Sequence, residues 1–159
     1  MDKKFNNLPL RKGVGIVLLN QNNQIFVAKR IDNPNDFWQM PQGGIDIGEN
    51  PLQAAYRELK EETSIESVKL IKEINNEITY LLPNNLLGII WRGKYKGQTQ
   101  KWFIMRFLGE DKEINLETNH PEFLDWKWIN LENITDKVVY FKLHVYEEIK
   151  KELKDLIHI

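Results

Sequence analysis

Residues 43–65 constrain the fold more than any other stretch, because a glycine-rich loop there leads directly into a strongly marked helix start. Asn50 is a favoured N-cap residue, Pro51 suits the first helical position, and Gln53 completes a capping-box pattern. The preceding glycines allow the backbone to approach a ligand closely and to adopt positive φ. The sequence therefore predicts a helix that begins at residue 51, directly after a glycine-rich loop that could contact a ligand.

The expected helix has two faces of different character. Its apolar face carries Leu52, Ala55, Tyr56 and Leu59. At about 100° per residue, Glu58, Glu61 and Glu62 fall together on another face. Such a face is often only a solvated acidic flank. Like charges at this spacing repel, however, so beside the glycine-rich loop they favour a bound divalent cation, and oxygen ligands suit Mg²⁺ or Mn²⁺.

The spacing of these residues resembles the Nudix box, GX5EX7REUXEEXGU, in which U is aliphatic. Gly43, Glu49 and the segment RELKEETSI at residues 57–65 match eight of its nine specified positions. The departure is Ser64, where the pattern has glycine. A non-glycine residue in a left-handed helix cap costs on the order of 1 kcal/mol. The resemblance implies an α/β fold, an α/β/α sandwich with a mixed β-sheet flanked by helices, and hydrolysis of a nucleoside diphosphate linked to another group.

Composition limits the other possibilities. The 159 residues fit a single domain, residues 1–159, with enough length for a sizeable core. Lys plus Arg number 22 against 23 for Asp plus Glu, which argues against a general nucleic-acid coat protein but allows a local basic patch. With no cysteine, the chain can form no disulfide or thiolate zinc site. No signal-peptide core or bilayer-length apolar run is found, so we expect a cytoplasmic protein without a membrane partner.

Alternating strand and helix patterns fill the rest of the chain. Apolar and β-branched runs predict strands at residues 13–19, 24–30, 68–74, 77–82, 86–91, 101–108 and 126–129. A basic loop with the sequence RGKYKGQTQ is expected at residues 92–100, between Trp91 and Trp102, either as an RNA contact or as a charged tip that protects a sheet edge. Apolar residues that recur every three or four positions predict a closing amphipathic helix over residues 138–157.

The Nudix resemblance also assigns roles to residues of the box. It implies that Glu58, Glu61 and Glu62 are the main metal ligands, joined by the backbone carbonyl of Gly43, and that Arg57 orients the glutamates by ion pairing. The sequence does not identify which glutamate takes the proton from water. Arg57 could otherwise be an ordinary surface cation.

Segments outside the box narrow the resemblance. Residues 38–44, 97–103, 121–123 and 138–142 are similar to the bacterial RNA pyrophosphohydrolase branch, a group also described as dinucleoside polyphosphate hydrolases. The similarity implies that Glu122 is a further metal ligand or base, although it could be an ordinary loop carboxylate.

The same similarity implies a set of substrate-binding residues: Arg11, Arg30, Gln42, Lys101, Phe141 and Lys142. Guanidinium groups match phosphate oxygens, an aromatic face can stack on an unpaired base, and an ammonium can contact phosphate. Each residue has a plainer alternative. Phe141 fits the apolar stripe of the last helix and could be a core residue, and Arg11 and Arg30 flank strands and could be surface charges.

Three functions remain open from the sequence. The first is a metal-dependent RNA 5′ pyrophosphohydrolase that converts the 5′-triphosphate or diphosphate end of mRNA to a monophosphate and so promotes decay. The second is the same catalyst acting on diadenosine tetraphosphate or other dinucleoside polyphosphates. The third is a Nudix module that senses nucleotides without cleaving them, which the complete glutamate set disfavours. We expect a monomer that does not bind DNA.

Overall fold

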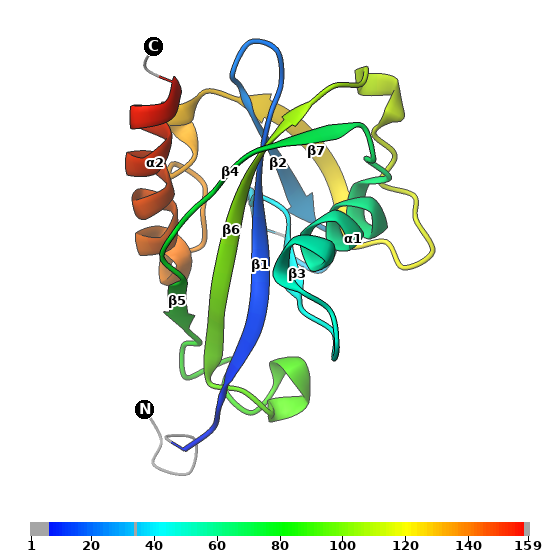
Figure 1. Cartoon of the computed structure of the whole chain (residues 1–159). Helices are drawn as coiled ribbons and strands as arrows, with labels where there is room; N and C mark the ends of the chain where they lie inside the picture. Colours follow the sequence, from blue (N-terminus) through cyan, green and yellow to red (C-terminus); the bar gives the residue numbers. More distant parts are fainter. Residues whose placement is uncertain (1–6, 34, 158–159) are drawn as a thin grey trace.

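The computed structural model describes residues 7–33 and 35–157, which form one mixed sheet with helices packed on it (Figure 1). The first six residues, which belong to the N-terminal segment inspected for a signal peptide, lie outside the described part. The strands are β1 (Leu10–Leu19), β2 (Ile25–Arg30), β3 (Gln42–Gly44), β4 (Val68–Glu73), β5 (Ile78–Leu81), β6 (Gly97–Phe107) and β7 (Phe123–Ile129). The helices are α1 (Pro51–Thr63) and α2 (Leu143–Ile157).

The strands pair in the order β4-β6-β1-β2-β7, with β3 added beside β1 and β5 beside β6. Strands β1 and β6 run parallel over ten residue pairs, from Leu10 opposite Gly97 to Leu19 opposite Arg106. The other pairings are antiparallel. This mixture of directions confirms the predicted mixed sheet.

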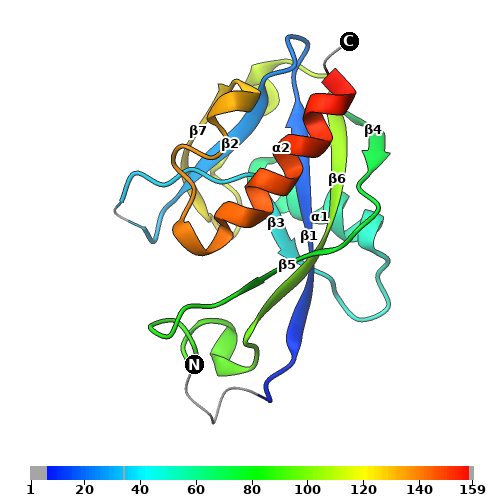
Figure 2. The ribbon, with the colours of Figure 1, turned by 90° about the vertical axis from the view of Figure 1, so that its left-hand side faces the viewer.

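The two helices cover opposite faces of the sheet (Figures 1 and 2). Helix α1 packs with Val14, Ile16 and Phe26 in one buried cluster, and helix α2 packs with Val17 and Trp102 in the other. Because side chains alternate along a strand, β1 supplies both clusters from successive residues. The predicted α/β/α sandwich is therefore confirmed.

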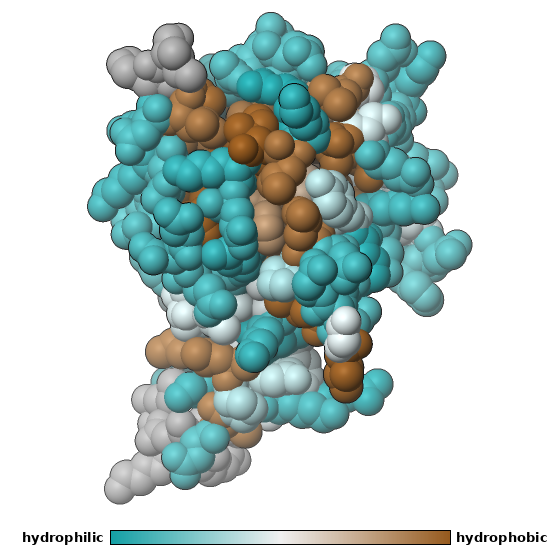
Figure 3. Space-filling view, viewed as in Figure 1, coloured by the Kyte–Doolittle hydropathy of each residue, from teal (hydrophilic) through white to brown (hydrophobic). Residues whose placement is uncertain are grey.

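In the view of Figure 3, hydrophilic side chains cover most of the outer part of the surface and surround an apolar area near its centre. Among the described residues, no helix has the length and apolar character needed to cross a bilayer.

Helix α1 begins as its capping residues predict. The Asn50 side chain accepts a hydrogen bond from the Gln53 backbone N–H at 2.9 Å, and the Gln53 side chain accepts one from the Asn50 N–H at 3.1 Å. The helix ends where Ser64 adopts a left-handed conformation with φ of 67°, the position where the Nudix pattern has glycine. One detail of the predicted apolar face is wrong: Tyr56 is 39% exposed, whereas Ala54 is buried in its place.

Two predictions about which residues form strands are wrong. Residues 86–91 form turns and a short 3-10 helix (Ile90–Gly93), because Pro83 and Gly88 support chain reversals there. The polar residues 97–100, expected in a loop, instead begin β6, where they pair with both β1 and β5. Trp102 is consequently a fully buried core residue and does not end a loop.

The closing helix is shorter than predicted. Residues Tyr140–Lys142 form a 3-10 turn, preceded by Val139 in an extended conformation, and α2 begins only at Leu143. The apolar periodicity continues through this turn, so it could not locate the boundary. The turn matters for the site because it carries Phe141 and Lys142.

Candidate active site

Arg57 is the centre of the polar network on helix α1. Its guanidinium forms two hydrogen bonds with Glu49, at 2.8 and 2.9 Å, and one each with Glu58 at 2.9 Å and Glu61 at 3.1 Å. A fifth bond, of 2.8 Å, goes to the backbone carbonyl of Gly44. Arg57 thus joins the glycine-rich loop to the glutamate face, an arrangement that agrees with an orienting role and not with a free surface cation.

These contacts have electrostatic consequences. The paired Arg57 guanidinium lowers the pKa of Glu49 to about 2, with help from a backbone hydrogen bond at Asp46. The pKa of Arg57 itself is raised, first by its hydrogen bonds with Glu49. Both groups are therefore charged at any physiological pH, which keeps the loop fixed to the helix.

Glu62 occupies an unusual environment for a carboxylate. Its side chain is 2% exposed, and its Oε2 atom has no hydrogen-bond partner among the described residues. Burial raises the pKa of Glu62 well above its ordinary value, and repulsion from Glu122 and Glu58 adds to the shift. The pKa of Glu58 is also raised, first by burial, although Arg57 opposes the change. A buried carboxylate of this kind is stabilised only by a proton or a cation.

Gly43 lies directly against the Glu58 carboxylate. A Cβ atom built at this position would stand 2.0 Å from Glu58 Cδ, so only glycine permits the approach. The backbone of strand β3 therefore reaches the same place as the carboxylates of α1, as expected if the Gly43 carbonyl and the glutamates share a ligand.

The donor set is suited to a divalent cation that prefers oxygen ligands. The buried Glu62 Oε2 without a partner among the described residues and the close approach of the Gly43 backbone to Glu58 fit such an ion. Its charge would oppose the repulsion that contributes to the raised carboxylate pKa values. Within the described part of the chain, however, no three acidic or histidine side chains are already spaced as a ligand group. Glu61 is turned toward Arg57 with its side chain 58% exposed. Individual ligands therefore stay predictions.

Glu122 comes from the loop that precedes β7, far from the helix in sequence. Its backbone carbonyl accepts a hydrogen bond from the Ile31 N–H at 2.9 Å, which fixes the loop at the end of strand β2. Its charge acts on both Glu58 and Glu62. The structure thus brings Glu122 near the helix carboxylates.

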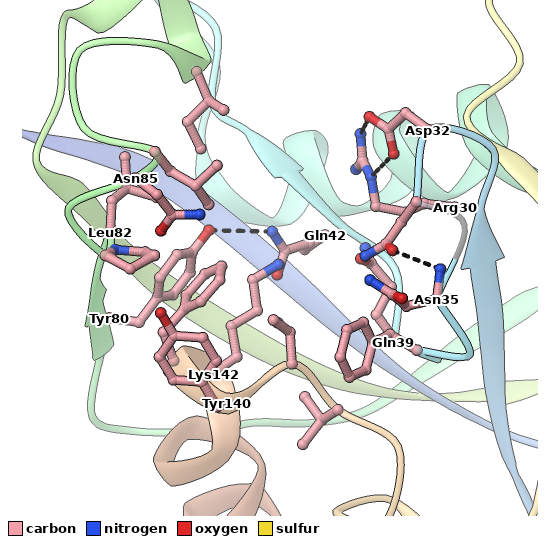
Figure 4. Close-up of a pocket in the computed structure, with 18 of the residues that line it drawn as sticks. Arg30, Asp32, Asn35, Gln39, Gln42, Tyr80, Leu82, Asn85, Tyr140 and Lys142 are labelled. Atoms are coloured by element: carbon pink, nitrogen blue, oxygen red, sulfur yellow. Dashed lines mark hydrogen bonds and ion pairs between the residues drawn. The ribbon is translucent and has the colours of Figure 1, made fainter.

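A pocket of about 680 Å³ opens beside this cluster (Figure 4). Its lining includes Arg30, Gln42, Tyr80, Phe141 and Lys142, which come from β2, β3, β5 and the turn before α2. Gln42 directly precedes Gly43, and the charge of Arg30 acts on Glu62 and Glu122. The pocket therefore adjoins the carboxylates and brings four of the predicted substrate-binding residues together.

Cations and aromatic rings are interleaved in this pocket. The Lys142 Nζ atom lies 5.2 Å from the centre of the Tyr80 ring and 5.9 Å from that of Phe141. Burial and, to a smaller extent, the Arg30 charge lower the pKa of Lys142, Glu62 opposes the change, and the resulting pKa is about 7. Phe141 is partly buried, packs on the α2 core and also lines the pocket, so its core packing is confirmed and base stacking stays a prediction. The hydrogen bonds to Asp32, at 2.8 and 2.9 Å, hold the Arg30 guanidinium at the rim.

The two remaining predicted residues lie apart from this lining. Arg11 places its guanidinium carbon 5.1 Å from the centre of the Trp91 ring, and its NH2 atom is close to Gly44. Lys101 donates a 2.9 Å hydrogen bond to the Asn75 carbonyl and pairs with Glu73 at 3.3 Å. Arg11 is therefore near the glycine-rich loop, whereas Lys101 is engaged by the β4–β5 connection and is not part of the pocket wall.

Sequence reasoning missed several polar residues at the pocket. Tyr80 lines it, and Gln100 and Gln98 lie behind Gln42 in a fully buried row. The alternation of Gln98, Gln100 and Trp102 was a usable signal, since residues two apart on a strand share a face. Polar residues at these positions are equally typical of a loop, so this pattern alone does not predict a strand.

Comparisons with known proteins identify the family of this chain. The family model described as NUDIX domain matches residues 9–149. A Pelagibacter ubique protein named RNA pyrophosphohydrolase is 68% identical over 152 residues, covering 96% of each chain. A Rhodospirillum rubrum protein with the same name is 49% identical over 146 residues, covering 92% of this chain and 88% of the relative.

Solved structures show the same fold at lower sequence identity. The dihydroneopterin triphosphate pyrophosphohydrolase of E. coli superposes with a TM-score of 0.69 at 23% identity, covering 91% of this chain and 99% of that one. A C. elegans Ap4A hydrolase complex gives a TM-score of 0.63 at 20% identity, with coverage of 90% and 98%. With the matched box, the sandwich fold and these relatives, the chain belongs to the Nudix family.

Proposed function

We propose that this chain is a metal-dependent RNA 5′ pyrophosphohydrolase, which hydrolyses the 5′ end of mRNA to a 5′-monophosphate. Pyrophosphate leaves a 5′-triphosphate end, and orthophosphate leaves a 5′-diphosphate end. The observation that carries the proposal is the 68% identity, over 96% of both chains, with a relative named RNA pyrophosphohydrolase. The pocket supports it, because aromatic rings and cations lie beside a carboxylate cluster, as a phosphorylated nucleotide end requires.

Nudix hydrolases generally need divalent metal ions, and for this chain we propose Mg²⁺ or Mn²⁺. The proposed ligands are Glu58, Glu61, Glu62 and Glu122, with the Gly43 carbonyl. The bound ion would neutralise charge on the pyrophosphate and favour ionisation of the attacking water. Arg57 keeps Glu58 and Glu61 oriented, and a carboxylate of the cluster accepts the proton that water loses.

The pocket residues would hold the nucleotide end. We assign Phe141 to stacking on a base, and Arg30, Gln42 and Lys142 to phosphate or first-nucleotide contacts. Arg11 would act from the side of the glycine-rich loop, where its guanidinium lies close to Gly44. Lys101 would contribute only if it left Glu73, so we give it the smallest role.

The proposed activity also bears on the location, nucleic-acid preference and oligomeric state of the protein. An mRNA substrate suits a cytoplasmic location. A formal charge of −1 suits recognition of RNA ends and not a DNA-coating role. We further propose that residues 1–159 act as one monomeric domain.

The test uses RNA labelled in the β-phosphate of its 5′-triphosphate, with purified protein and Mg²⁺ or Mn²⁺. Release of labelled pyrophosphate, leaving a 5′-monophosphate, supports the proposal. Loss of that release in Phe141→Ala, with an unchanged melting temperature, would support base stacking. Cleavage of diadenosine tetraphosphate alone would favour the dinucleotide alternative. Binding of either compound without cleavage would favour the sensor.

A further inference from the structure

A continuous row of hydrogen-bonded side chains leads from the buried core to the pocket. Trp102 Nε1 donates to Gln100 Oε1 at 3.1 Å, Gln100 Nε2 donates to Gln42 Oε1 at 3.1 Å, and Gln42 Nε2 donates to the Tyr80 hydroxyl at 3.3 Å. Trp102 and Gln100 are fully buried, and Gln42 and Tyr80 line the pocket. The row thus connects a residue of the α2-facing core with the proposed phosphate site.

The Trp102 indole determines which atom donates and which accepts in every hydrogen bond of this row. An indole N–H can only donate, so Gln100 must present its oxygen to Trp102. The Gln100 nitrogen then faces the other way, where its two hydrogens are donated to Gln42 Oε1 and, at 2.8 Å, to Gln98 Oε1. Gln42 in turn must present its oxygen to Gln100, which leaves its N–H groups directed toward Tyr80 and the pocket.

The surrounding backbone is shaped to hold this row. A Cβ atom at Gly13 would stand 2.5 Å from Gln98 Cδ, and one at Gly15 would stand 2.4 Å from the Trp102 ring. Two glycines of β1 therefore leave the room that the glutamine and tryptophan side chains fill. Figure 4 shows the outer end of the row, with a dashed line from Gln42 to the Tyr80 hydroxyl and the Lys142 side chain extending toward them. A buried polar row with so little free space has few alternative arrangements.

We propose that Trp102 and Gln100 are positioning residues for the substrate, because they hold the Gln42 amide with its N–H side, and not its carbonyl oxygen, toward the phosphate chain. The inference rests on the proposed function for the identity of the substrate. An N–H group attracts a phosphate oxygen and a carbonyl oxygen repels it. The orientation of the Gln42 amide therefore decides whether its contact with phosphate is attractive or repulsive.

Gln100→Glu tests the orientation with almost no change in shape. In its ionised form, which an alkaline assay buffer favours, the carboxylate still accepts from Trp102 but offers no hydrogen to Gln42, so the Gln42 amide turns over to donate to it. We expect KM for 5′-triphosphorylated RNA to rise on the order of 10- to 100-fold while kcat changes little. Gln24→Glu, at the β1–β2 turn, makes the same charge change away from the pocket and should leave KM unchanged.

A double-mutant cycle separates positioning from general support of the core. In a Gln42→Ala background no amide remains to be oriented, so Gln100→Glu should no longer raise KM. An equal rise in both backgrounds would contradict the proposal. If Gln100→Glu does not fold, Trp102→Phe carries the test: it frees the Gln100 amide and should raise KM, whereas Trp128→Phe, which removes an indole N–H far from the row, should not. An unchanged KM in Trp102→Phe would likewise contradict it.

A binding measurement keeps this inference separate from the proposed RNA activity. Titration calorimetry with inorganic tripolyphosphate and Ca²⁺ compares the wild-type chain with Gln100→Glu without relying on RNA turnover. Weaker binding by the variant supports the positioning role even if RNA is not a substrate. Equal binding by both proteins overturns it even if RNA is hydrolysed.

Discussion

Gly43→Ala is the sharpest test of how the loop and helix α1 form one site. The new methyl group would stand 2.0 Å from Glu58 Cδ, and this separation must widen to at least 3.4 Å for ordinary contact. The backbone of β3 is held by its pairing with Val14 of β1, so the Glu58 carboxylate moves instead. The displacement exceeds 1 Å, and a shift of that size in a catalytic group lowers the rate about 100-fold, or by about 2.7 kcal/mol in activation free energy.

The assay measures kcat for pyrophosphate release from 5′-triphosphorylated RNA, together with Mn²⁺ affinity from electron paramagnetic resonance. Both should fall in Gly43→Ala, while the melting temperature changes little because Gly43 has no left-handed φ. Gly48→Ala is the matched control: its φ is +82° and an added Cβ meets nothing within 4 Å, so it should lose stability but keep kcat. A normal kcat in Gly43→Ala would refute the close packing of loop and carboxylate as a requirement for activity.

Three further predictions concern the glutamates, Lys142 and the helix end. Glu61→Gln or Glu62→Gln should abolish RNA turnover while circular dichroism shows an intact fold; normal turnover in both variants would remove the proposed catalytic centre. Because burial lowers the pKa of Lys142 to about 7 from 10.5, the unfolded chain binds the proton more tightly between these values, so stability should rise with pH across pH 7 to 10.5. That rise should be missing in Lys142→Met in denaturant titrations at several pH values, and an unchanged slope would contradict the assigned burial. Ser64→Gly should be more stable than Ser64→Ala by about 1 kcal/mol, because both lose the hydroxyl bond to Asn115 but only glycine relieves the left-handed φ of 67°; equal melting temperatures would show that the cap is not strained.

The sequence was most informative where local chemistry alone decides the structure. The start of helix α1 followed from Asn50, Pro51 and Gln53, whose hydrogen bonds need no distant partner. The placement of Glu58, Glu61 and Glu62 on helix α1 followed from local sequence, whereas the turn of Glu61 toward Arg57 did not. Glu122 could be linked to them only through resemblance, because a loop near β7 must fold back beside strand β2 to reach them.

Prediction failed where tertiary contacts override the local pattern. Residues 86–91 are apolar because Leu87 is buried in the core beside α2 and Trp91 packs on Tyr80, and not because they form a strand. Residues 97–100 are polar yet form a central strand, in which Gln100 donates to Gln98 inside the protein while Gln98 Nε2 finds no partner among the described residues. A pattern of hydrophobicity does not report the burial of polar side chains. The alternation of Gln98, Gln100 and Trp102 could indicate a shared face, but their hydrogen bonds to Gln42 follow only from the three-dimensional structure.

The central claim is most directly tested by comparing kcat/KM for a short 5′-triphosphorylated RNA and for diadenosine tetraphosphate, at equal concentrations with Mg²⁺ or Mn²⁺. The proposed function predicts a higher value for RNA, with pyrophosphate as the released product. A clear preference for diadenosine tetraphosphate would contradict it and assign the pocket to dinucleotide hydrolysis.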